Sequence, residues 1–501
     1  MSDGGTRPGV RACLAPAVAM HFGLVGHVHA CCQNGRYSYG AVAEQSLVEI
    51  WSGEARRAMA ASLAEGDYPT GCEGCEVEHG LGQRGATPAV AFDEFATGDT
   101  DPAWPRQLEF TLSNRCNLAC VQCNGENSST IRAQREGRPP LPPAYDDGFF
   151  AQLPPFLEHA EVVSFLGGEP FLAPEARRVL DLLLASTNRP VVRVTTNVTV
   201  WSDAVERYLR DLRMHVALSI DGATAETYEA VRVGARYERV VTVRDRILAV
   251  AAETGAQVDL NYCLLRANWH EVGAFFAQAD ALDLDANVIP VREPAEHSLF
   301  TLDLAELGPI VAALEAEDEW RAAERGRNRE RWTAVVGLLR QQLDLLAAGD
   351  PTETRVDRIR RARSGADERD LADRRRRTTA LFAAAEQELG HWASVEPIEV
   401  TTEGPSVTAI AAPAWAATLE PVRWVGADVG SLRLVAADGL GTVEVAEVGD
   451  RSGGEGLLFE TDSVLVIGDR RVRFRTVYAP GLGRMLIATP DATELAALGT
   501  G

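Results

Sequence analysis

Short apolar runs alternate with helix-like stretches between about residues 105 and 295. The runs are rich in Val, Leu, Ile, Phe and Thr, a composition typical of β-strands. Strands that alternate with helices predict repeated βα units and a parallel sheet. The six predicted strands are QLEFTL (107–112), EVVSFL (161–166), VVRVTT (191–196), HVALSI (215–220), VDLNYCLL (258–265) and DANVIPV (285–291).

The predicted strands have one polar and one apolar face. In the first strand Glu109 and Thr111 share a face, and in the fifth Asp259, Asn261 and Cys263 do the same. The apolar face of a parallel sheet packs against helices, so the polar face points into a lumen. A closed barrel fills its interior with branched apolar side chains. The polarity therefore favours a partial barrel with room for ligands.

Three further regions flank this core, which we place at residues 101–295. Residues 1–100 are rich in Gly and Cys, with one predicted helix over 46–63. Residues 296–390 are predicted to be helical and charged. Residues 391–501 contain strand-like runs separated by Gly and Asp turns, which predict a β-rich domain.

Charge and cysteine content narrow the classes of function. A net charge of −23 disfavours nucleic acid and anionic membranes as partners. We find no long apolar run and no signal peptide, so we expect a cytoplasmic protein. Thiols stay reduced in the cytosol, and eight of the nine cysteines precede residue 125. This clustering indicates metal binding or catalysis rather than disulfides.

Three of these cysteines, Cys116, Cys120 and Cys123, form a CxxxCxxC motif directly after the first predicted strand. Three thiolates in one loop can bind three irons of a cubane and leave the fourth iron open. Zinc is the alternative metal, but structural zinc sites use four ligands, commonly in CxxC pairs.

The motif order resembles that of the radical S-adenosylmethionine (SAM) superfamily. After CxxxCxxC comes Gly167-Gly168-Glu169-Pro170, at the end of the second strand. The resemblance covers about residues 105–295 and implies a partial (β/α)6 barrel. It also implies that the three cysteines bind a [4Fe–4S] cluster, that SAM chelates the fourth iron, and that the GGE segment contacts the SAM amino group. Two glycines allow close approach, and Glu169 can accept a hydrogen bond from an ammonium.

The same resemblance implies SAM contacts at the ends of later strands. Asn197 and Ser219 occupy the matching positions, both on the predicted polar face. One position departs from the family pattern: the residue before the third cysteine is commonly aromatic, and here it is Gln122.

The N-terminal cysteines resemble the SPASM/twitch module, which binds an auxiliary cluster. The matching segments are Cys13-Leu-Ala-Pro, GHVHACC (26–32), SLVEIWSG (46–53) and CEGC (72–75). The resemblance implies a second [4Fe–4S] cluster on Cys13, Cys31, Cys72 and Cys75, with Cys32 as the alternative to Cys31. A structural zinc site on the same residues is the competing interpretation.

The implied activity is formation of a 5′-deoxyadenosyl radical that abstracts hydrogen from a substrate in the lumen. Enzymes of similar architecture often modify peptides or proteins, including ribosomally made natural products, so a peptide is the first substrate hypothesis. Dehydrogenation or epimerisation of a small metabolite, such as a sugar or an aminocyclitol, is the second. A non-catalytic iron–sulfur or zinc protein is a hypothesis of another class. The expected electron donor is a flavodoxin or a ferredoxin.

Cys263 stands apart from the other cysteines. A lone strand cysteine is usually a small buried apolar residue. Its predicted lumen-facing position would also allow a catalytic role as a hydrogen-atom donor, or a role as a cluster ligand.

Overall fold

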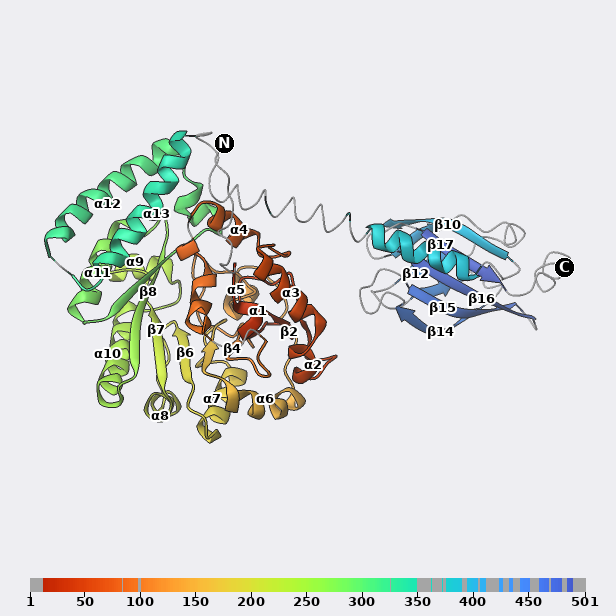
Figure 1. Cartoon of the computed structure of the whole chain (residues 1–501), viewed down its shortest axis with the longest axis horizontal. Helices are drawn as coiled ribbons and strands as arrows, with labels where there is room; N and C mark the ends of the chain where they lie inside the picture. Colours follow the sequence, from red (N-terminus) through yellow and green to blue (C-terminus); the bar gives the residue numbers. More distant parts are fainter. Residues whose placement is uncertain are drawn as a thin grey trace. The chain divides into compact units, whose positions relative to one another are not determined.

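The computed structural model describes residues 12–348 apart from 83, 98–100 and 325. Beyond residue 348 it describes 362, 372, 375–389 and the strands β10 to β17. The chain divides into two compact units, residues 1–364 and 365–501 (Figure 1). None of the described helices is both long and apolar enough to cross a membrane.

A nine-stranded sheet is the centre of the first unit. Its strand order is β3-β2-β1-β4-β5-β6-β7-β8-β9, and β4 to β9 run parallel. The six predicted strands are all present, which confirms the partial α/β barrel. The bounds are β4 (Gln107–Phe110), β5 (Val162–Phe165), β6 (Val191–Thr196), β7 (Met214–Ser219), β8 (Gln257–Leu264) and β9 (Asp285–Pro290).

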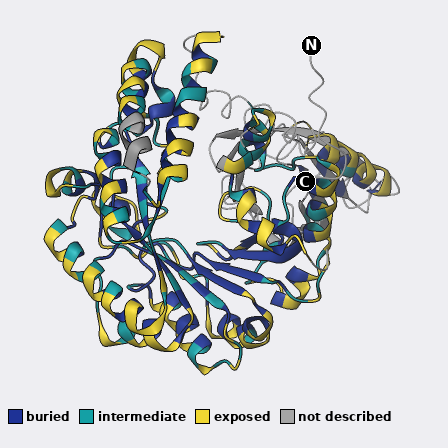
Figure 2. Cartoon of the chain, turned by 60° about the vertical axis from the view of Figure 1, so that its left-hand side comes forward, coloured by how far each residue is buried: buried dark blue, intermediate teal, exposed yellow. Residues whose placement is uncertain are grey.

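Helices lie between the strands or follow β9, and several of them cover the outer face of this sheet (Figures 1 and 2). Their inward residues and the strands are buried, and their outward residues are exposed. The helices are α5 (Ser129–Gln134), α6 (Asp147–His159), α7 (Pro174–Ala185), α8 (Asp203–Asp211), α9 (Ala225–Val231), α10 (Tyr237–Thr254), α11 (Val272–Ala281), α12 (Leu304–Glu324) and α13 (Arg329–Ala348).

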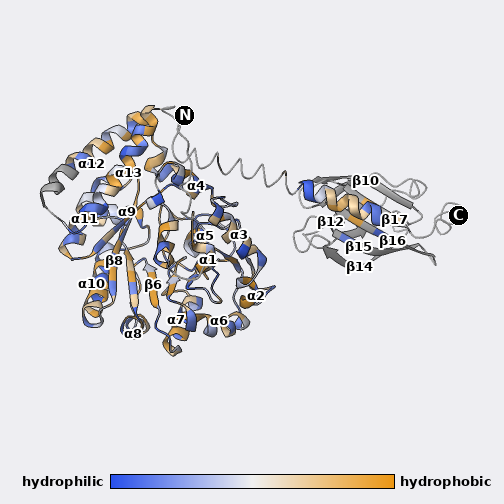
Figure 3. Ribbon diagram, in the orientation of Figure 1, coloured by the Kyte–Doolittle hydropathy of each residue, from blue (hydrophilic) through white to orange (hydrophobic). Residues whose placement is uncertain are grey.

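The N-terminal region is joined to the same sheet, which the sequence did not reveal. Strand β1 (Ala19–Phe22) pairs in parallel with β4, and β2 (His27–His29) and β3 (Gly40–Ala41) extend the sheet in antiparallel. Phe22 lies beside Phe110, and their rings stack with centroids 5.0 Å apart. Apolar residues concentrate along these central strands (Figure 3). The region around the N-terminal cysteines and the barrel therefore share one core.

The predicted helix over 46–63 is two helices, α2 (Leu47–Trp51) and α3 (Glu54–Glu65). Ser46 begins α2 with a capping box, in which its side chain and that of Glu49 satisfy each other's backbone N–H groups. Gly53 adopts an extended conformation and begins α3. The apolar spacing continues across this break, so periodicity alone could not locate it.

The second unit contains a helix at 375–389 and a six-stranded antiparallel sheet of order β11-β10-β17-β16-β15-β14. Its described core includes Phe382, Leu389, Val477 and Leu486. The strands are β10 (Ser394–Glu403), β11 (Ser406–Ile410), β14 (Thr442–Asp450), β15 (Phe459–Ile467), β16 (Arg470–Ala479) and β17 (Arg484–Thr489), with β12 (Arg423–Gly426) and β13 (Leu432–Val435) as a separate pair.

Because β1 belongs to the barrel sheet, Phe22→Ala should destabilise both regions together. Phe22 is fully buried, so we expect a loss of about 3–5 kcal/mol in the free energy of unfolding. Hydrogen exchange at increasing urea concentration would follow β1 and β5 peptides separately. Val48→Ala, at a position 57% exposed, is the matched control. Loss of protection in β1 with β5 unchanged would contradict a shared core.

Candidate functional site

The CxxxCxxC loop leaves β4 at the carboxyl edge of the sheet and is held by many hydrogen bonds. Asn114 Nδ2 donates to the Gly125 carbonyl at 2.9 Å, and Ser128 Oγ donates to the Leu118 carbonyl at 2.7 Å. The backbone N–H groups of Ala119 and Val121 donate to Val233 and Val231 near the end of α9. The loop therefore has a fixed shape before any metal is considered.

The three thiols of this loop lie within electrostatic range of one another. Burial raises the pKa of the Cys120 thiol to about 11, and the nearby Arg232 guanidinium opposes that rise. Burial also raises the pKa of Cys123, against Arg135. These two arginines supply positive charge where thiolates or an anionic cluster would need it.

The two glycines after β5 pack directly against the start of this loop. Gly167 has a φ of +99°, and a Cβ on Gly168 would lie 2.4 Å from the Arg115 carbonyl oxygen. The backbone N–H of Gly168 donates to the Ser113 carbonyl, and that of Glu169 donates to the Arg115 carbonyl at 2.8 Å. Only glycine allows this approach, so the segment supports the cysteine loop.

Glu169 is completely buried and joins the β5 end to the β6 end. Its carboxylate accepts hydrogen bonds from the Asn197 N–H at 2.7 Å, Thr196 Oγ1 at 2.9 Å and the Phe171 N–H at 3.2 Å. Burial raises its pKa to about 7, and these hydrogen bonds oppose the rise. Pro170 is buried beside it. Contact between the GGE segment and a SAM amino group stays a prediction.

Asn197 lies against the cysteine loop. Its Nδ2 donates to Asn117 Oδ1 at 3.0 Å and approaches Cys116 Sγ at 3.7 Å. The next residue, Val198, has a φ of +62°, which is a strained conformation for a β-branched residue. The Glu169–Asn197 hydrogen bond helps to hold this turn. Ser219 is buried at the end of β7, where the sequence placed it, and its contact with SAM stays a prediction.

Asp221, just after β7, is the centre of a second buried network. Its carboxylate accepts from Gln122 Nε2, Arg232 Nε and the Cys263 N–H, each at 2.7 Å. Gln122, which replaces the usual aromatic residue, thereby ties the cysteine loop to β8. The Cys263 thiol faces this network, and burial raises its pKa to about 12.

Sequence reasoning missed Asp221 and Arg232 as site residues. Asp221 could have been found from its place on the polar face at a strand end, beside Ser219. Arg232 follows a helix and carries no local signal, and only the fold brings it to Cys120.

The N-terminal thiols form a second set. Cys13 precedes α1 (Ala15–Val18), Cys31 follows β2, and Cys72 and Cys75 lie at α4 (Glu73–Gly80). Electrostatic interactions link Cys72 to the other three thiols. Burial raises the pKa of Cys13 to about 11, and that of Cys75 to about 11 against Arg292 and Arg84. Four thiols thus gather beside two guanidinium groups.

Cys32 lies apart from this second set in its contacts. Cys32 is an exposed residue whose thiol interacts with Glu109 and the adjacent Cys31, and its backbone N–H donates to Glu109 Oε1 at 3.0 Å. By contrast, Cys31 is partly buried and interacts with Cys13. The contacts therefore favour Cys31 over Cys32 as the fourth member.

The donor sets fit two iron–sulfur clusters, because each set consists of thiols near arginine and some sulfurs already accept hydrogen bonds. The Ala15 N–H donates to Cys13 Sγ at 3.4 Å, and Asn34 Nδ2 donates to Cys72 Sγ at 3.3 Å. Among the described residues, no group of three or more His, Cys, Asp or Glu side chains is placed to hold one metal ion. The cluster assignment rests on thiol spacing in the sequence and on these shared neighbourhoods.

Comparison with protein families matches both regions. The Radical SAM superfamily matches residues 110–275, and SPASM, an iron–sulfur cluster-binding domain, matches residues 13–76. The chain carries a radical SAM domain preceded by a SPASM domain. The cofactors of these domains are a [4Fe–4S] cluster with SAM and an additional iron–sulfur cluster. Both resemblances identified in the sequence are confirmed.

Curated relatives match this chain over part of its length. GTP 3′,8-cyclase of Chlorobaculum tepidum is 25% identical over 196 residues, 38% of this chain and 56% of the relative. Mycofactocin maturase MftC of Mycobacterium ulcerans is 26% identical over 226 residues, 44% of this chain and 56% of the relative. The chain thus spans little more than half the length of these relatives.

Solved structures give a more distant likeness. The structure of Streptococcus suis SuiB bound to precursor peptide SuiA has a TM-score of 0.33 and 14% identity, and the match covers 56% of this chain and 63% of that chain.

In the radical SAM domain, Gly168→Ala should displace the cysteine loop, because the new Cβ would meet the Arg115 backbone. We expect reconstituted protein to lose about four irons per chain, the content of one cubane. Iron and sulfide analysis would measure this. Gly337→Ala, on α13 where a Cβ meets nothing within 4 Å, is the control and should keep full iron. Full iron in both variants would contradict the role of Gly168.

Glu169 should also give the chain a pH-dependent stability. Its pKa is raised from 4.5 to about 7 in the folded protein, so the folded state holds this proton after the unfolded chain has released it. The contribution is complete below about pH 4.5 and is lost as pH rises to about 7, on the order of a few kcal/mol. Urea unfolding of wild type and Glu169→Gln across this range would test it. If the free energy of unfolding changes equally with pH in both proteins, Glu169 does not contribute the pH dependence.

Proposed function

We propose that the chain is a radical SAM enzyme that forms a 5′-deoxyadenosyl radical and uses it to modify a peptide or protein, as in maturation of a ribosomally made natural product. The observation that carries the proposal is the presence of two thiol sets on one sheet. Three cysteines, Cys116, Cys120 and Cys123, would leave the fourth iron of a cubane without a protein ligand, whereas the four N-terminal cysteines would leave none.

In this proposal Cys116, Cys120 and Cys123 hold the cluster that binds SAM. When bound, this cluster would supply the electron for reductive cleavage of the SAM sulfonium. Gly167 and Gly168 support the loop from the β5 side, and Asn197 does so from β6. Asn197 and Ser219 are the proposed SAM contacts, at the ends of neighbouring strands. Gln122 and Arg232 hold the other side through Asp221.

The N-terminal set is proposed to hold the auxiliary cluster through Cys13, Cys31, Cys72 and Cys75. Arg84 and Arg292 lie near Cys75 and would stabilise negative charge there. A cluster at this place suits removal of an electron from the substrate or direct substrate binding. A flavodoxin or ferredoxin is the proposed electron donor.

The peptide hypothesis draws support from a relative named as a maturase, MftC. The competing hypothesis is a small metabolite, such as a sugar or an aminocyclitol, and another relative is named for a nucleotide, GTP. A non-catalytic iron–sulfur or zinc protein is the alternative of another class. Release of deoxyadenosine would exclude that class, and incubation with a candidate peptide would separate the other two.

Paired variants test the assignment of the two sets. Cys120→Ala should abolish 5′-deoxyadenosine formation under dithionite, because the cluster with the open iron loses a ligand. The Cys72→Ala/Cys75→Ala variant should lose about four irons yet keep slow release of 5′-deoxyadenosine, because the auxiliary cluster does not bind SAM. Chromatography measures deoxyadenosine, and circular dichroism verifies folding.

Two results would contradict this assignment. Normal deoxyadenosine release by the Cys120 variant would show that the SAM-binding cluster lies elsewhere. Stoichiometric zinc in place of iron in anaerobically reconstituted protein would favour the zinc alternative.

A further inference from the structure

The outer edge of β9 has backbone groups that point away from the sheet. Among the described strands, β9 is the last of its sheet. The Val291 N–H donates to the Leu264 carbonyl, toward β8, whereas the Ala286 N–H donates outward to Asn328 Oδ1 at 2.8 Å. Backbone direction alternates along a strand, so the Val288 N–H points outward as well. Pro290 has no N–H, which leaves its carbonyl as the last outward group.

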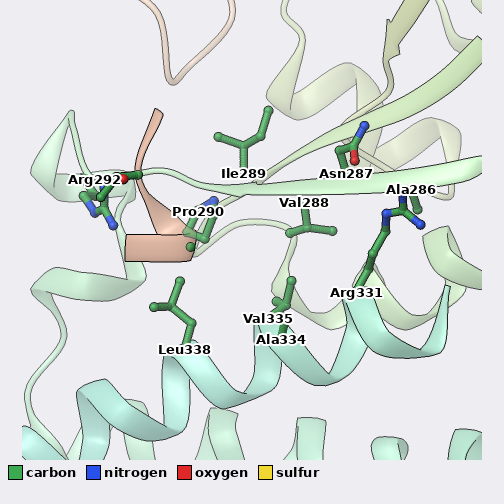
Figure 4. Close-up of a pocket in the computed structure, with 12 residues that line it drawn as sticks. Ala286, Asn287, Val288, Ile289, Pro290, Arg292, Arg331, Ala334, Val335 and Leu338 are labelled. Atoms are coloured by element: carbon green, nitrogen blue, oxygen red, sulfur yellow. The ribbon is translucent and has the colours of Figure 1, made fainter. Parts of the chain in front are cut away.

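A cavity of about 520 Å³ lies beside this edge. Its walls come from β9, from α13 and from the segment at Gly85 and Thr87, which follows the SPASM cysteines. Val288 and Pro290 point toward α13, and Val335 and Leu338 point back (Figure 4). Asn287 and Ile289 project from the opposite face of the strand. Alternate residues of β9 thus form one wall of a largely apolar groove.

Arg292 stands at the end of this groove. Its Nη2 lies 2.5 Å from Glu78 Oε1, which ties the segment after β9 to α4. Its Nε is buried and has no hydrogen-bond partner among the described residues. An unsatisfied buried donor costs free energy unless a ligand supplies an acceptor. A carboxylate would match both the donor and the positive charge.

We propose that this groove binds an extended segment of the substrate peptide, which adds a strand to the free edge of β9 and places a carboxylate against Arg292. This inference rests on the proposed function, since it assumes a peptide substrate. Backbone hydrogen bonds to the Val288 N–H and the Pro290 carbonyl provide affinity. Small apolar side chains at alternate positions of the peptide would pack against Val288, Val335 and Leu338.

The protection of this edge is incomplete, which supports a partner there. Free strand edges are normally blocked by charges, prolines or a covering helix. Asn328 satisfies the first outward N–H, whereas Val288, which carries the next N–H expected to point outward, lines the cavity. Arg292, which lines the groove, interacts electrostatically with Cys75, so a peptide held there would lie close to this auxiliary cysteine.

The test uses a synthetic peptide of about seven residues, enough to cover β9, with alternating valine and threonine and a glutamate at its end. It carries fluorescein, and anisotropy measures its binding to the full-length reconstituted protein. A second peptide has the same side chains and methylated backbone nitrogens. The protein variants are Ala334→Glu and Thr333→Glu. Both positions are exposed on α13, and only Ala334 lines the groove.

We expect wild type and Thr333→Glu to bind the first peptide equally. Ala334→Glu should bind it with an affinity lower by about tenfold or more. The methylated peptide should also bind about tenfold more weakly. Absence of binding to wild type, equal loss in both variants, or equal binding of both peptides would overturn the proposal. Iron content and deoxyadenosine release are measured on the same samples. Failure of the proposed function would appear in those values, and failure of this inference in anisotropy alone.

Discussion

The parallel pairing of β1 with β4 determines where both cysteine sets lie. Phe22 stacks on Phe110, and Phe110 in turn contacts Phe165 on β5, so apolar side chains anchor β1 to the barrel. Cys13 and Cys31 flank the β1–β2 hairpin, and the CxxxCxxC loop leaves the other end of β4. Since sheet geometry is stiff, the separation between the two sets is fixed by backbone pairing rather than by a linker.

Two buried carboxylates organise the carboxyl edge of the sheet in the same way. Glu169 connects the β5 end to β6, and Asp221 connects β7 to β8 and to the cysteine loop. A buried carboxylate is costly unless donors surround it, and each of these accepts at least three hydrogen bonds. The donors include backbone N–H groups, which position loops without relying on flexible side chains. The result is a rigid rim around the three thiols.

Local patterns in the sequence revealed much of this arrangement. The six barrel strands and their polar face follow from a period of two, and Glu109 and Asp259 do contact polar neighbours, His21 at 2.8 Å and His215 at 2.7 Å. The pairing of β1 was not predictable, because four residues carry too little pattern to identify a remote partner. Arg232 reaches Cys120 only through the fold, and the proposed preference for Cys31 over Cys32 rests on the interactions of Cys31 with Cys13 and Cys72. Periodicity cannot detect contacts of that kind.

The position of β1 also has a consequence for synthesis of the chain. Its partner β4 is translated much later, after all four N-terminal cysteines of the SPASM set, so β1 leaves the ribosome without the strand that covers its edge. Until β4 arrives, β1 can pair only with β2 on its other edge, and pairing of such distant segments as β1 and β4 is slow. Nascent chains with open edges of this sort are prone to aggregation. The period between translation of β1 and of β4 is therefore when the chain most needs a chaperone or an early cluster to keep its N-terminal region compact.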